Sequence, residues 1–256
     1  MPSLFDLTGQ TAVITGSSRG IGKATAYRMA EHGANVVVSS RKADACDAAV
    51  AEINAAVGRE AAIAVPANIA IKADLQRLVD TSIARFGQID ALVCNAASNP
   101  YFGPSAGIAD EQFDKILRNN IVSNHWLIAM VAPAMAARGA GSITIISSIG
   151  GLKASTIIGA YCISKAADMQ LARNLAAEYG PSGVRVNAIC PGLIKTDFAK
   201  ALWDNPDILD ASTKDTPLRR IGEPDEIAGM AVFLAAKAGA FTTGQSFVID
   251  GGVTIV

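Results

Sequence analysis

The chain has 256 residues, half of them hydrophobic, and a formal net charge of −1 at pH 7. This length suits one large α/β domain or two small ones. The near-neutral charge without a Lys/Arg run excludes the electrostatic footprint that nucleic-acid or anionic-membrane binding needs, so a small neutral or anionic molecule is the expected partner.

The rest of the composition argues against membranes, disulfides and metals. The opening segment MPSLFDLTGQ has no basic stretch followed by an apolar one, and no uncharged apolar run reaches about 18 residues. We therefore expect a cytoplasmic protein without a membrane span. Neither a disulfide framework nor a metal site is expected, because no paired spacing links Cys46, Cys94, Cys162 and Cys190.

Short β-branched runs alternate with longer alanine-rich segments along the whole chain. The runs are continuously apolar, as expected for strands buried on both faces of a parallel sheet. Seven strands are predicted, at residues 11–15, 35–39, 61–65, 91–94, 142–147, 184–189 and 246–249. Helices are predicted near residues 20–32, 43–57, 72–86, 110–137, 159–178 and 224–237. His32 precedes Gly33 where the first helix should stop, so a C-terminal cap is its expected role.

This pattern predicts a doubly wound Rossmann-like α/β fold, with a seven-stranded parallel sheet and helices on both faces. The length also suits an eight-stranded barrel, but a glycine-rich turn directly after the first strand favours the open sheet. No internal repeat or Pro/Gly/Ser linker marks a second domain, so residues 1–256 are expected to form one domain.

The glycine-rich turn TGSSRGIG joins the first strand to the first helix. Gly16, Gly20 and Gly22 allow a tight turn and a close approach of the backbone to a ligand. The N-terminus of the helix supplies unsatisfied N–H groups and a positive dipole, which suit a pyrophosphate. A plain tight turn is the alternative interpretation.

The end of the second strand, VVVSSRK, indicates which nucleotide binds there. An acidic residue at this position would hydrogen-bond the adenosine ribose and repel a 2′-phosphate, whereas this chain has Ser40 and Arg41. Arg41, with Arg19 from the glycine-rich turn, is positioned to clamp a phosphate. The sequence therefore favours NADP(H) over NAD(H), the alternative being that Arg41 only faces water.

Tyr161 and Lys165 in the stretch YCISK, together with Ser148 thirteen residues upstream, predict a proton-transfer site. In a helix over 159–178, positions i and i+4 share one face, so the Lys165 ammonium should lie near the phenol. A free tyrosine titrates near about 10, and an adjacent positive charge lowers this by roughly 1 to 3 units. We therefore expect Tyr161 to have a lowered pKa.

Residues 191–223 are too long for an ordinary connection and contain Phe198, Leu202 and Trp203. Their apolar content favours a lid over substrate, with a solvated insertion as the alternative. The predicted walls of the pocket suit an apolar carbonyl compound, although any of them could instead be local packing: Tyr101, Phe102, Leu152, Leu193 and Trp203.

With TGSSRGIG, the Ser148, Tyr161 and Lys165 set, and the later PGLIKT, the chain resembles the short-chain dehydrogenase/reductase family over essentially its whole length. The resemblance implies that Ser148 positions the substrate oxygen, Tyr161 transfers the proton and Lys165 holds the nicotinamide ribose. It also implies a fourth catalytic residue, Asn120, which would hold a water linking Lys165 to bulk, with Asn119 as the competing assignment. The implied cofactor contacts are Gly16, Ser18, Arg19, Gly20, Ile21, Gly22, Ser40, Arg41, Asn68, Ile69, Asn95, Tyr161, Lys165, Pro191, Gly192, Ile194 and Thr196.

Two stretches depart from the family pattern. The family usually has NNAG after the fourth strand, and this chain has CNAA, so Ala97 replaces a glycine and demands an ordinary φ. Asn68 stands where an acidic residue often meets the adenine ring. Three segments are similar to NADP(H)-dependent carbonyl reductases and retinol dehydrogenases of the peroxisomal dehydrogenase/reductase type: CNAASNPYFG, VVVSSRK and CPGLIKTDFAKALW. The ending VTIV lacks the peroxisomal tripeptide.

The expected activity is the interconversion of a ketone or aldehyde and its alcohol, with Tyr161 as proton donor or acceptor. One alternative is a 3-oxoacyl carrier-protein reductase, which would need a basic patch for which Arg138 and Arg173 are the candidates. A second is an NADP(H)-binding protein without catalysis. The apolar helix 224–237 and the tail FVIDGGVTIV suggest a subunit interface, and the resemblance implies a homotetramer, although alanine content alone gives the same apolarity.

Overall fold

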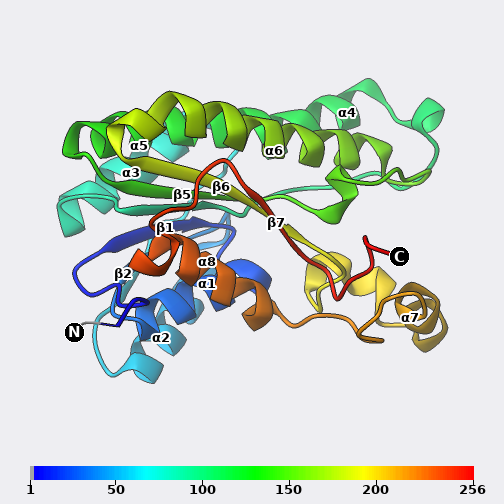
Figure 1. The fold of residues 1–256 in the computed structure, drawn as a ribbon, viewed down its shortest axis with the longest axis horizontal. Helices are drawn as coiled ribbons and strands as arrows, with labels where there is room; N and C mark the ends of the chain where they lie inside the picture. Colours follow the sequence, from blue (N-terminus) through cyan, green and yellow to red (C-terminus); the bar gives the residue numbers. More distant parts are fainter. Residues whose placement is uncertain (1–2) are drawn as a thin grey trace.

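One parallel sheet of seven strands forms the centre of the structure, a computed structural model that describes residues 3–256 (Figure 1). The strand order is β3-β2-β1-β4-β5-β6-β7. This order and the helices on both faces confirm the predicted doubly wound Rossmann-like fold. The strands are β1 (Thr11–Thr15), β2 (Asn35–Ser39), β3 (Ala62–Ala64), β4 (Ala91–Cys94), β5 (Gly141–Ile146), β6 (Val184–Pro191) and β7 (Ser246–Ile249).

The predicted strands are confirmed, four of them with their predicted bounds: β1, β2, β4 and β7. β3 is shorter than predicted by one residue at each end, β5 lies one residue earlier, and β6 continues to Pro191. Successive side chains of a strand enter two different apolar clusters. In β1, Ala12 and Ile14 pack into one cluster and Val13 into the other. Burial on both faces is why the apolar runs are continuous.

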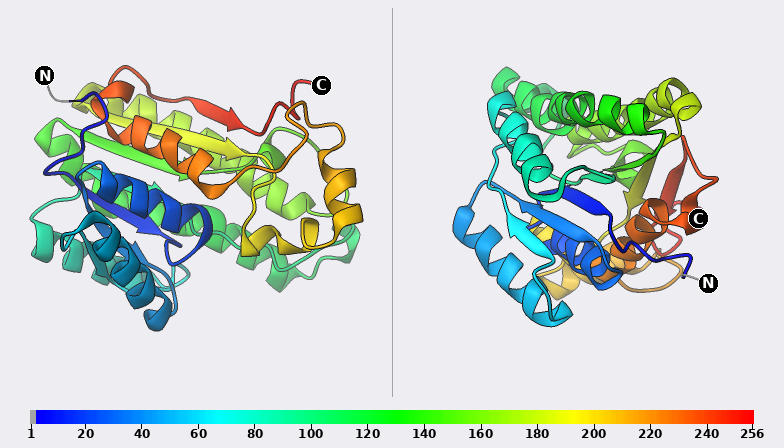
Figure 2. Two further views of the ribbon diagram at one scale, coloured as in Figure 1. Left: turned by 90° about the horizontal axis from the view of Figure 1, so that it is seen from below. Right: turned by 90° about the vertical axis from the view of Figure 1, so that its left-hand side faces the viewer.

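Two layers of helices enclose the sheet (Figure 2). One layer contains α1 (Gly20–Glu31), α2 (Ala43–Val57) and α8 (Pro224–Ala235), and the other contains α3 (Lys72–Phe86), α4 (Asp110–Leu117), α5 (Ser123–Arg138) and α6 (Gly159–Tyr179). The apolar faces of the two layers belong to separate clusters, with Met29 of α1 in one and Met169 of α6 in the other. α8 stops two residues before the predicted end because Ala236 is extended, with φ −80° and ψ 173°.

The helix predicted over residues 110–137 is interrupted. A π-helical turn, Arg118–Val122, separates α4 from α5. Such turns insert an extra residue into a helix, and they occur frequently at functional sites. The π turn carries Asn120, one of the predicted catalytic residues, whose side chain is fully buried.

The topology places the carboxyl ends of the strands at one edge, where a ligand site is expected. From β1 the chain proceeds to β2 and β3 on one side, while β4 pairs with β1 on the other. In open α/β sheets the crevice at such a switch point binds ligands. The glycine-rich turn follows β1, and Ser148 follows β5, so both lie at this edge.

Residues 191–223, the segment predicted to be a lid, form a folded excursion beyond this edge (Figure 1). The segment contains a 3₁₀ turn, Asp197–Leu202, and the short helix α7 (Pro206–Thr213). Its two ends are joined, because Lys195 N–H donates to the Gly222 carbonyl at 2.9 Å and Gly222 N–H donates to the Leu193 carbonyl at 3.0 Å. The segment is therefore a closed loop with its own secondary structure.

None of the helices that the structure describes is long and apolar enough to cross a membrane. Within residues 3–256, no three His, Cys, Asp or Glu side chains gather in a way that would hold a metal ion. The four cysteines are free thiols, and Cys46, Cys94 and Cys190 are buried.

Asn187 of β6 holds the loop that leads into the edge strand β7. Its buried side chain donates to the Thr242 carbonyl at 2.9 Å and accepts from the Gln245 N–H at 3.0 Å. Because both partners would be left unsatisfied, we expect Asn187→Ala to lower the free energy of unfolding by about 2 to 4 kcal/mol in urea titrations. The matched change Asn174→Ala, on the exposed face of α6, should cost less than about 0.5 kcal/mol. Equal losses would contradict this account.

Candidate active site

Helix α6 carries the two residues that the sequence singles out, and it places them together. Tyr161 and Lys165 lie in the first two turns of α6, and the Lys165 Nζ lies 5.7 Å from the centroid of the Tyr161 ring. Lys165 is 2% exposed, and its Nζ donates to the Ile146 carbonyl at the end of β5, at 2.8 Å. The predicted proximity of the ammonium and the phenol is confirmed.

Ser148, which follows β5, lies beside Tyr161 and Lys165. It caps a 3₁₀ turn, Ile149–Gly151, with its Oγ accepting from the Gly150 N–H at 3.0 Å. Its hydroxyl also lies close enough to the Tyr161 phenol to lower the pKa of that group. The three predicted residues Ser148, Tyr161 and Lys165 therefore converge at the carboxyl edge of the sheet.

The pKa of Tyr161 corrects one expectation. Burial is the largest influence and raises the pKa of the phenol. The Lys165 charge lowers it, as the sequence predicted, and the Ser148 hydroxyl lowers it as well, but the nearby Asp168 raises it again. The net direction is upward, so the expectation of a lowered value was wrong for this structure. The spacing of Tyr161 and Lys165 predicted the ammonium but not the burial or the carboxylate.

Asn120 connects the π turn to α6. Its Oδ1 accepts from the Ser98 N–H at 2.8 Å, and its Nδ2 donates to the Ser98 carbonyl at 3.1 Å and to the Ser164 Oγ at 3.0 Å. Ser164 directly precedes Lys165, so Asn120 braces the helix that carries the reactive pair. The competing residue Asn119 donates instead to the Ser98 Oγ at 2.9 Å. The structure thus places Asn120 against the site; its role in holding a water stays a prediction.

The glycine-rich turn has the features of a phosphate cradle. Helix α1 has no side-chain cap and no acidic residue in its first turn, which suits an anion at its N-terminus. Gly22 packs so closely that an added Cβ would lie 2.5 Å from the Gly16 carbonyl oxygen. The predicted contact Asn95 donates its Nδ2 to the carbonyls of Thr15 and Gly16, at 2.9 and 3.1 Å, so it holds the turn against β4. Ser18 and Ile21 lie half-buried in the same segment.

The residues that would receive the adenosine end of a dinucleotide lie at the ends of β2 and β3. Arg41 is exposed, and no ion pair with it occurs in the described part of the chain. Arg19 is instead paired with Asp197 of the lid, at 3.0 Å. Asn68 forms a local turn, accepting from the Ala70 N–H at 3.2 Å, beside the half-buried Ile69. These residues fit a nicotinamide dinucleotide, since the phosphate cradle, a basic side chain and the predicted proton donor share one edge.

The lid begins beside the phosphate cradle and extends over the tyrosine. A methyl group on Gly20 would lie 3.2 Å from the Thr196 Cγ2, so the start of the lid lies against the turn. The ring centroids of Phe198 and Tyr161 lie 6.0 Å apart. Among the other predicted contacts here, Pro191 and Ile194 are buried, and the Gly192 N–H donates to the Ile249 carbonyl at 2.9 Å. The lid interpretation is therefore consistent with the geometry.

The predicted pocket walls do not all gather at Tyr161. Phe102 and Leu152 are 61% and 49% exposed, Leu193 is half-buried, and the Tyr101 hydroxyl donates to the Pro104 carbonyl at 2.8 Å. Trp203 lines a different hollow, beneath the lid, together with Lys195, Leu209, Arg220, Ile221, Glu223 and Glu226. Its indole N–H donates to the Thr196 carbonyl at 2.8 Å. The role of these five residues as pocket walls stays a prediction.

The sequence analysis missed three residues at the site. Phe198 was assigned to the lid but not to the pocket, and neither Asp168 nor Asn124 was singled out. Asp168 lies three residues after Lys165 on the same helix, and Asn124 lies four residues after Asn120. Both spacings place side chains on a shared helix face, so the sequence itself indicated that Asp168 lies near Lys165 and Asn124 near Asn120.

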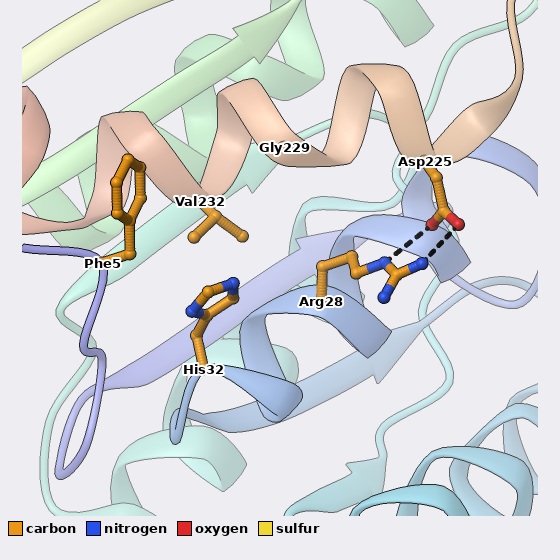
Figure 3. Close-up of a pocket in the computed structure, with 6 residues that line it drawn as sticks. All are labelled: Phe5, Arg28, His32, Asp225, Gly229 and Val232. Atoms are coloured by element: carbon orange, nitrogen blue, oxygen red, sulfur yellow. Dashed lines mark hydrogen bonds and ion pairs between the residues drawn. The ribbon is translucent and has the colours of Figure 1, made fainter. Parts of the chain in front are cut away.

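A second hollow, of about 470 Å³, lies between α1 and α8, away from the candidate active site (Figure 3). Arg28 and Asp225 form a two-point ion pair at its rim, with distances of 3.1 Å from Nε and 2.7 Å from Nη2. His32, which caps α1 as predicted, points into it. The hollow contains none of the catalytic candidates and is lined by Phe5, Arg28, His32, Asp225, Gly229 and Val232.

Comparisons with known proteins agree with the geometry. Residues 16–254 match the family model described as enoyl-(acyl carrier protein) reductase. Dehydrogenase/reductase SDR family member 4 of Homo sapiens and that of Mus musculus are 39% and 38% identical over 247 residues, covering 96% of this chain and 88% of each relative. A solved 7α-hydroxysteroid dehydrogenase, complexed with NADH and 7-oxo glycochenodeoxycholic acid, is 36% identical, with a TM-score of 0.92 and coverage of 97% of this chain and 95% of that one. A solved protein of Beutenbergia cavernae, described as an assigned but unproven NAD(P)-dependent gluconate 5-dehydrogenase with NADP bound at low occupancy, is 32% identical, with a TM-score of 0.93 and coverage of 99% of this chain and 100% of that one.

The close packing at Gly22 gives a test of the phosphate cradle. In Gly22→Ala, the new methyl group would push against the Gly16 carbonyl and the Asn95 amide, so the turn should open. We expect dissociation constants for NADPH and NADH, measured by nicotinamide fluorescence, to rise about tenfold or more through loss of phosphate hydrogen bonds. Gly229→Ala in α8, where the added Cβ meets no heavy atom within 4 Å, is the matched control and should bind normally. Unchanged binding by Gly22→Ala would contradict the assignment.

Proposed function

The chain belongs to the short-chain dehydrogenase/reductase family of oxidoreductases acting on CH–OH and C=O groups, and on that premise we propose that it interconverts an apolar ketone or aldehyde and its alcohol with NADP(H). The observation that supports this most strongly is the convergence of Ser148, Tyr161 and Lys165 beside a glycine-rich phosphate cradle. The lid residue Phe198 lies over the tyrosine.

In the proposed mechanism, the substrate oxygen accepts hydrogen bonds from the hydroxyls of Ser148 and Tyr161. The nicotinamide cofactor, when bound, supplies or accepts the hydride. As the carbonyl is reduced, Tyr161 gives its phenolic proton to the developing alkoxide, and Lys165 stabilises the phenolate that remains. In the reverse direction Tyr161 acts as the base that takes the alcohol proton.

The preference for NADP(H) is supported by the end of β2. A carboxylate that would repel a 2′-phosphate is missing there, and the exposed Arg41 is free of ion pairs in the described residues. A guanidinium offers two parallel donors to a phosphate, which a lysine does not. Arg19 has a competing partner in Asp197, so we assign the larger share of phosphate recognition to Arg41.

An apolar substrate is supported by the residues near the tyrosine. Phe198, which is 56% exposed, lies beside Tyr161. A hydrophobic ligand would cover its ring, as apolar side chains line most small-molecule sites. Phe102 and Leu152 are also exposed apolar side chains, and we keep them as candidates for the same pocket.

A carrier-protein substrate, the alternative considered from the sequence, has less support, although the matching family model is described by such an activity. Arg138 directs its guanidinium to the Ile89 carbonyl at 2.6 Å, and Arg173 is bound to Gln170 on the surface of α6. The two guanidinium groups therefore engage their own neighbours and form no shared basic patch.

We further propose a cytoplasmic homotetramer. β7 is an edge strand of the sheet and exposes 42% of Val248, while Phe241 in the preceding loop is fully exposed. An exposed edge strand with apolar side chains requires protection from aggregation, and pairing with another subunit supplies it.

Tyr161→Phe tests the proton-transfer role. Loss of the hydroxyl should lower kcat for carbonyl reduction by at least about 10²-fold, because a positioned proton donor contributes that much or more. Tyr179→Phe, at the other end of α6, is the matched control and should retain turnover within about twofold. Stopped-flow or steady-state nicotinamide absorbance with a carbonyl panel gives the measurement, and a fully active Tyr161→Phe enzyme would reject the mechanism.

Arg41→Ala tests the cofactor preference. Losing a charged hydrogen-bond donor to the 2′-phosphate should raise KM for NADPH about 10- to 100-fold and leave KM for NADH unchanged. Lys42→Ala, the neighbouring positive charge, should change both values much less. The same carbonyl and alcohol panel, run with NADPH and NADH, also tests the proposed activity, since turnover with neither cofactor would contradict it.

A further inference from the structure

A buried carboxylate lies directly behind the reactive pair. Asp168 of α6 is completely buried, and its Oδ2 accepts from the Lys165 Nζ at 2.9 Å. A buried carboxylate is costly unless its oxygens are paired and hydrogen-bonded. The mechanism proposed above assigns no task to this group.

Asn124 of α5 anchors the other side of the carboxylate. Its Nδ2 donates to the Asp168 Oδ1 at 3.0 Å and to the main-chain carbonyl of Asn120 at 2.7 Å. The second bond fixes the orientation of the amide, because only the nitrogen can donate to a carbonyl. Both oxygens of Asp168 therefore accept from donors, which is the pattern of an ionised carboxylate.

The network links the π turn to the reactive lysine. It proceeds from the main-chain carbonyl of Asn120 through the side chains of Asn124 on α5 and Asp168 on α6 to Lys165, which also lies on α6. Of the three donors on the Lys165 ammonium, one is bound by Ile146 and one by Asp168. The third N–H has no partner among the described residues.

We propose that Asp168, anchored by Asn124, is a positioning residue that keeps Lys165 charged and aimed at the reacting groups. This inference rests on the proposed function, in which Lys165 acts as an ammonium. Asp168 acts through Lys165 and has no contact with substrate in this account.

Near pH 7, Lys165 and Asp168 carry the main charges of this buried site. The ionisable side chains that face it are Tyr161 and Cys162 on α6, Cys94 on β4 and Cys190 on β6. Burial raises the pKa of each of them, so all four are neutral near pH 7. Burial by itself lowers the pKa of Lys165, but Asp168, followed by Tyr161, reverses that effect and the net direction is upward. Burial also raises the pKa of Asp168, against the lowering effect of Lys165 and Asn124. The ionised form is indicated by the two donors that bind its two oxygens.

The direction in which the pKa of Tyr161 and Lys165 should shift follows from the negative charge of Asp168. Tyr161 and Lys165 share a coupled titration, so the first proton lost belongs to the pair. The negative charge of Asp168 disfavours the loss of that proton, whether Tyr161 or Lys165 carries it. Replacing Asp168 by a neutral residue should therefore make proton loss easier and move the first macroscopic pKa of the pair down, by about 1 to 3 units.

The experiment compares Asp168→Asn, Asp168→Ser and Asp168→Leu, three neutral replacements of different size, so that any one that folds answers the question. Tyrosinate absorbance is titrated in the cofactor-free protein. Subtracting the same variant carrying Tyr161→Phe isolates Tyr161 from the other three tyrosines. Thermal unfolding at pH 7 records how much stability each replacement costs.

The result expected is a lower pKa in every folded neutral variant and a value near that of the parent in Asp168→Glu, which restores the charge. Asp90→Asn is the matched control: its carboxylate holds the Thr11 N–H at 2.9 Å at the opposite edge of the sheet, and it should not move the titration. Lost stability with an unchanged titration would overturn the proposal and leave Asp168 a structural role only.

The titration needs neither substrate nor cofactor, so it distinguishes this inference from the proposed function. A downward shift in a protein that reduces no carbonyl compound would support Asp168 and reject the activity. Where a substrate is found, the alkaline limb of kcat/KM for reduction should move to lower pH by the same amount in the neutral variants. A limb that stays in place would also overturn the proposal.

Discussion

The burial of the Lys165 ammonium is the constraint on which the site depends. A cation this far from water is stable only with fixed partners, and it has two of them, the Ile146 carbonyl and the Asp168 carboxylate. One partner belongs to the end of β5 and the other to α6 itself. Because the ammonium is held by Asp168 of its own helix and also donates to Ile146, the helix cannot slide along the sheet without breaking the hydrogen bond to β5. The distance between Tyr161 and Ser148, one on α6 and the other just after β5, is maintained by the same contacts.

The π turn makes this arrangement possible. Within the π turn, the Asn120 carbonyl accepts from the Asn124 side chain, which in turn holds Asp168. The Asn120 side chain then reaches α6 through Ser164 and the loop after β4 through Ser98. Three elements are thus joined by one irregular turn, which offsets the poorer hydrogen bonding of a π helix with tertiary contacts.

The sequence predicted the features that local patterns determine. The strands and the open sheet followed from continuous apolar runs, and the Tyr161–Lys165 contact followed from helical spacing. The π turn was not predicted, because Asn120 and Ser98 must meet in space before it becomes favourable. The direction of the Tyr161 pKa was wrong for a related reason: the spacing identifies a neighbouring charge but gives no measure of burial. Asp168 was overlooked because an alanine-rich helix suggests packing, although its spacing from Lys165 was visible.

The segment 191–223, the proposed lid, is held by different contacts from the Lys165–Asp168 ion pair of the active site. The Arg19–Asp197 pair that joins the lid to the phosphate cradle is exposed on both sides, so it contributes about 0 to 1 kcal/mol. The backbone bonds at Lys195 and Gly222 close the base of the segment, and Phe198, three residues after Lys195, lies beside Tyr161 near that base. None of these contacts involves Lys165 or Asp168, so the segment and the buried ion pair behind Tyr161 are held by separate contacts. The contacts of the segment lie at the surface and those of the ion pair are buried, so a change that loosens the segment should leave the position of the Lys165 ammonium unaltered.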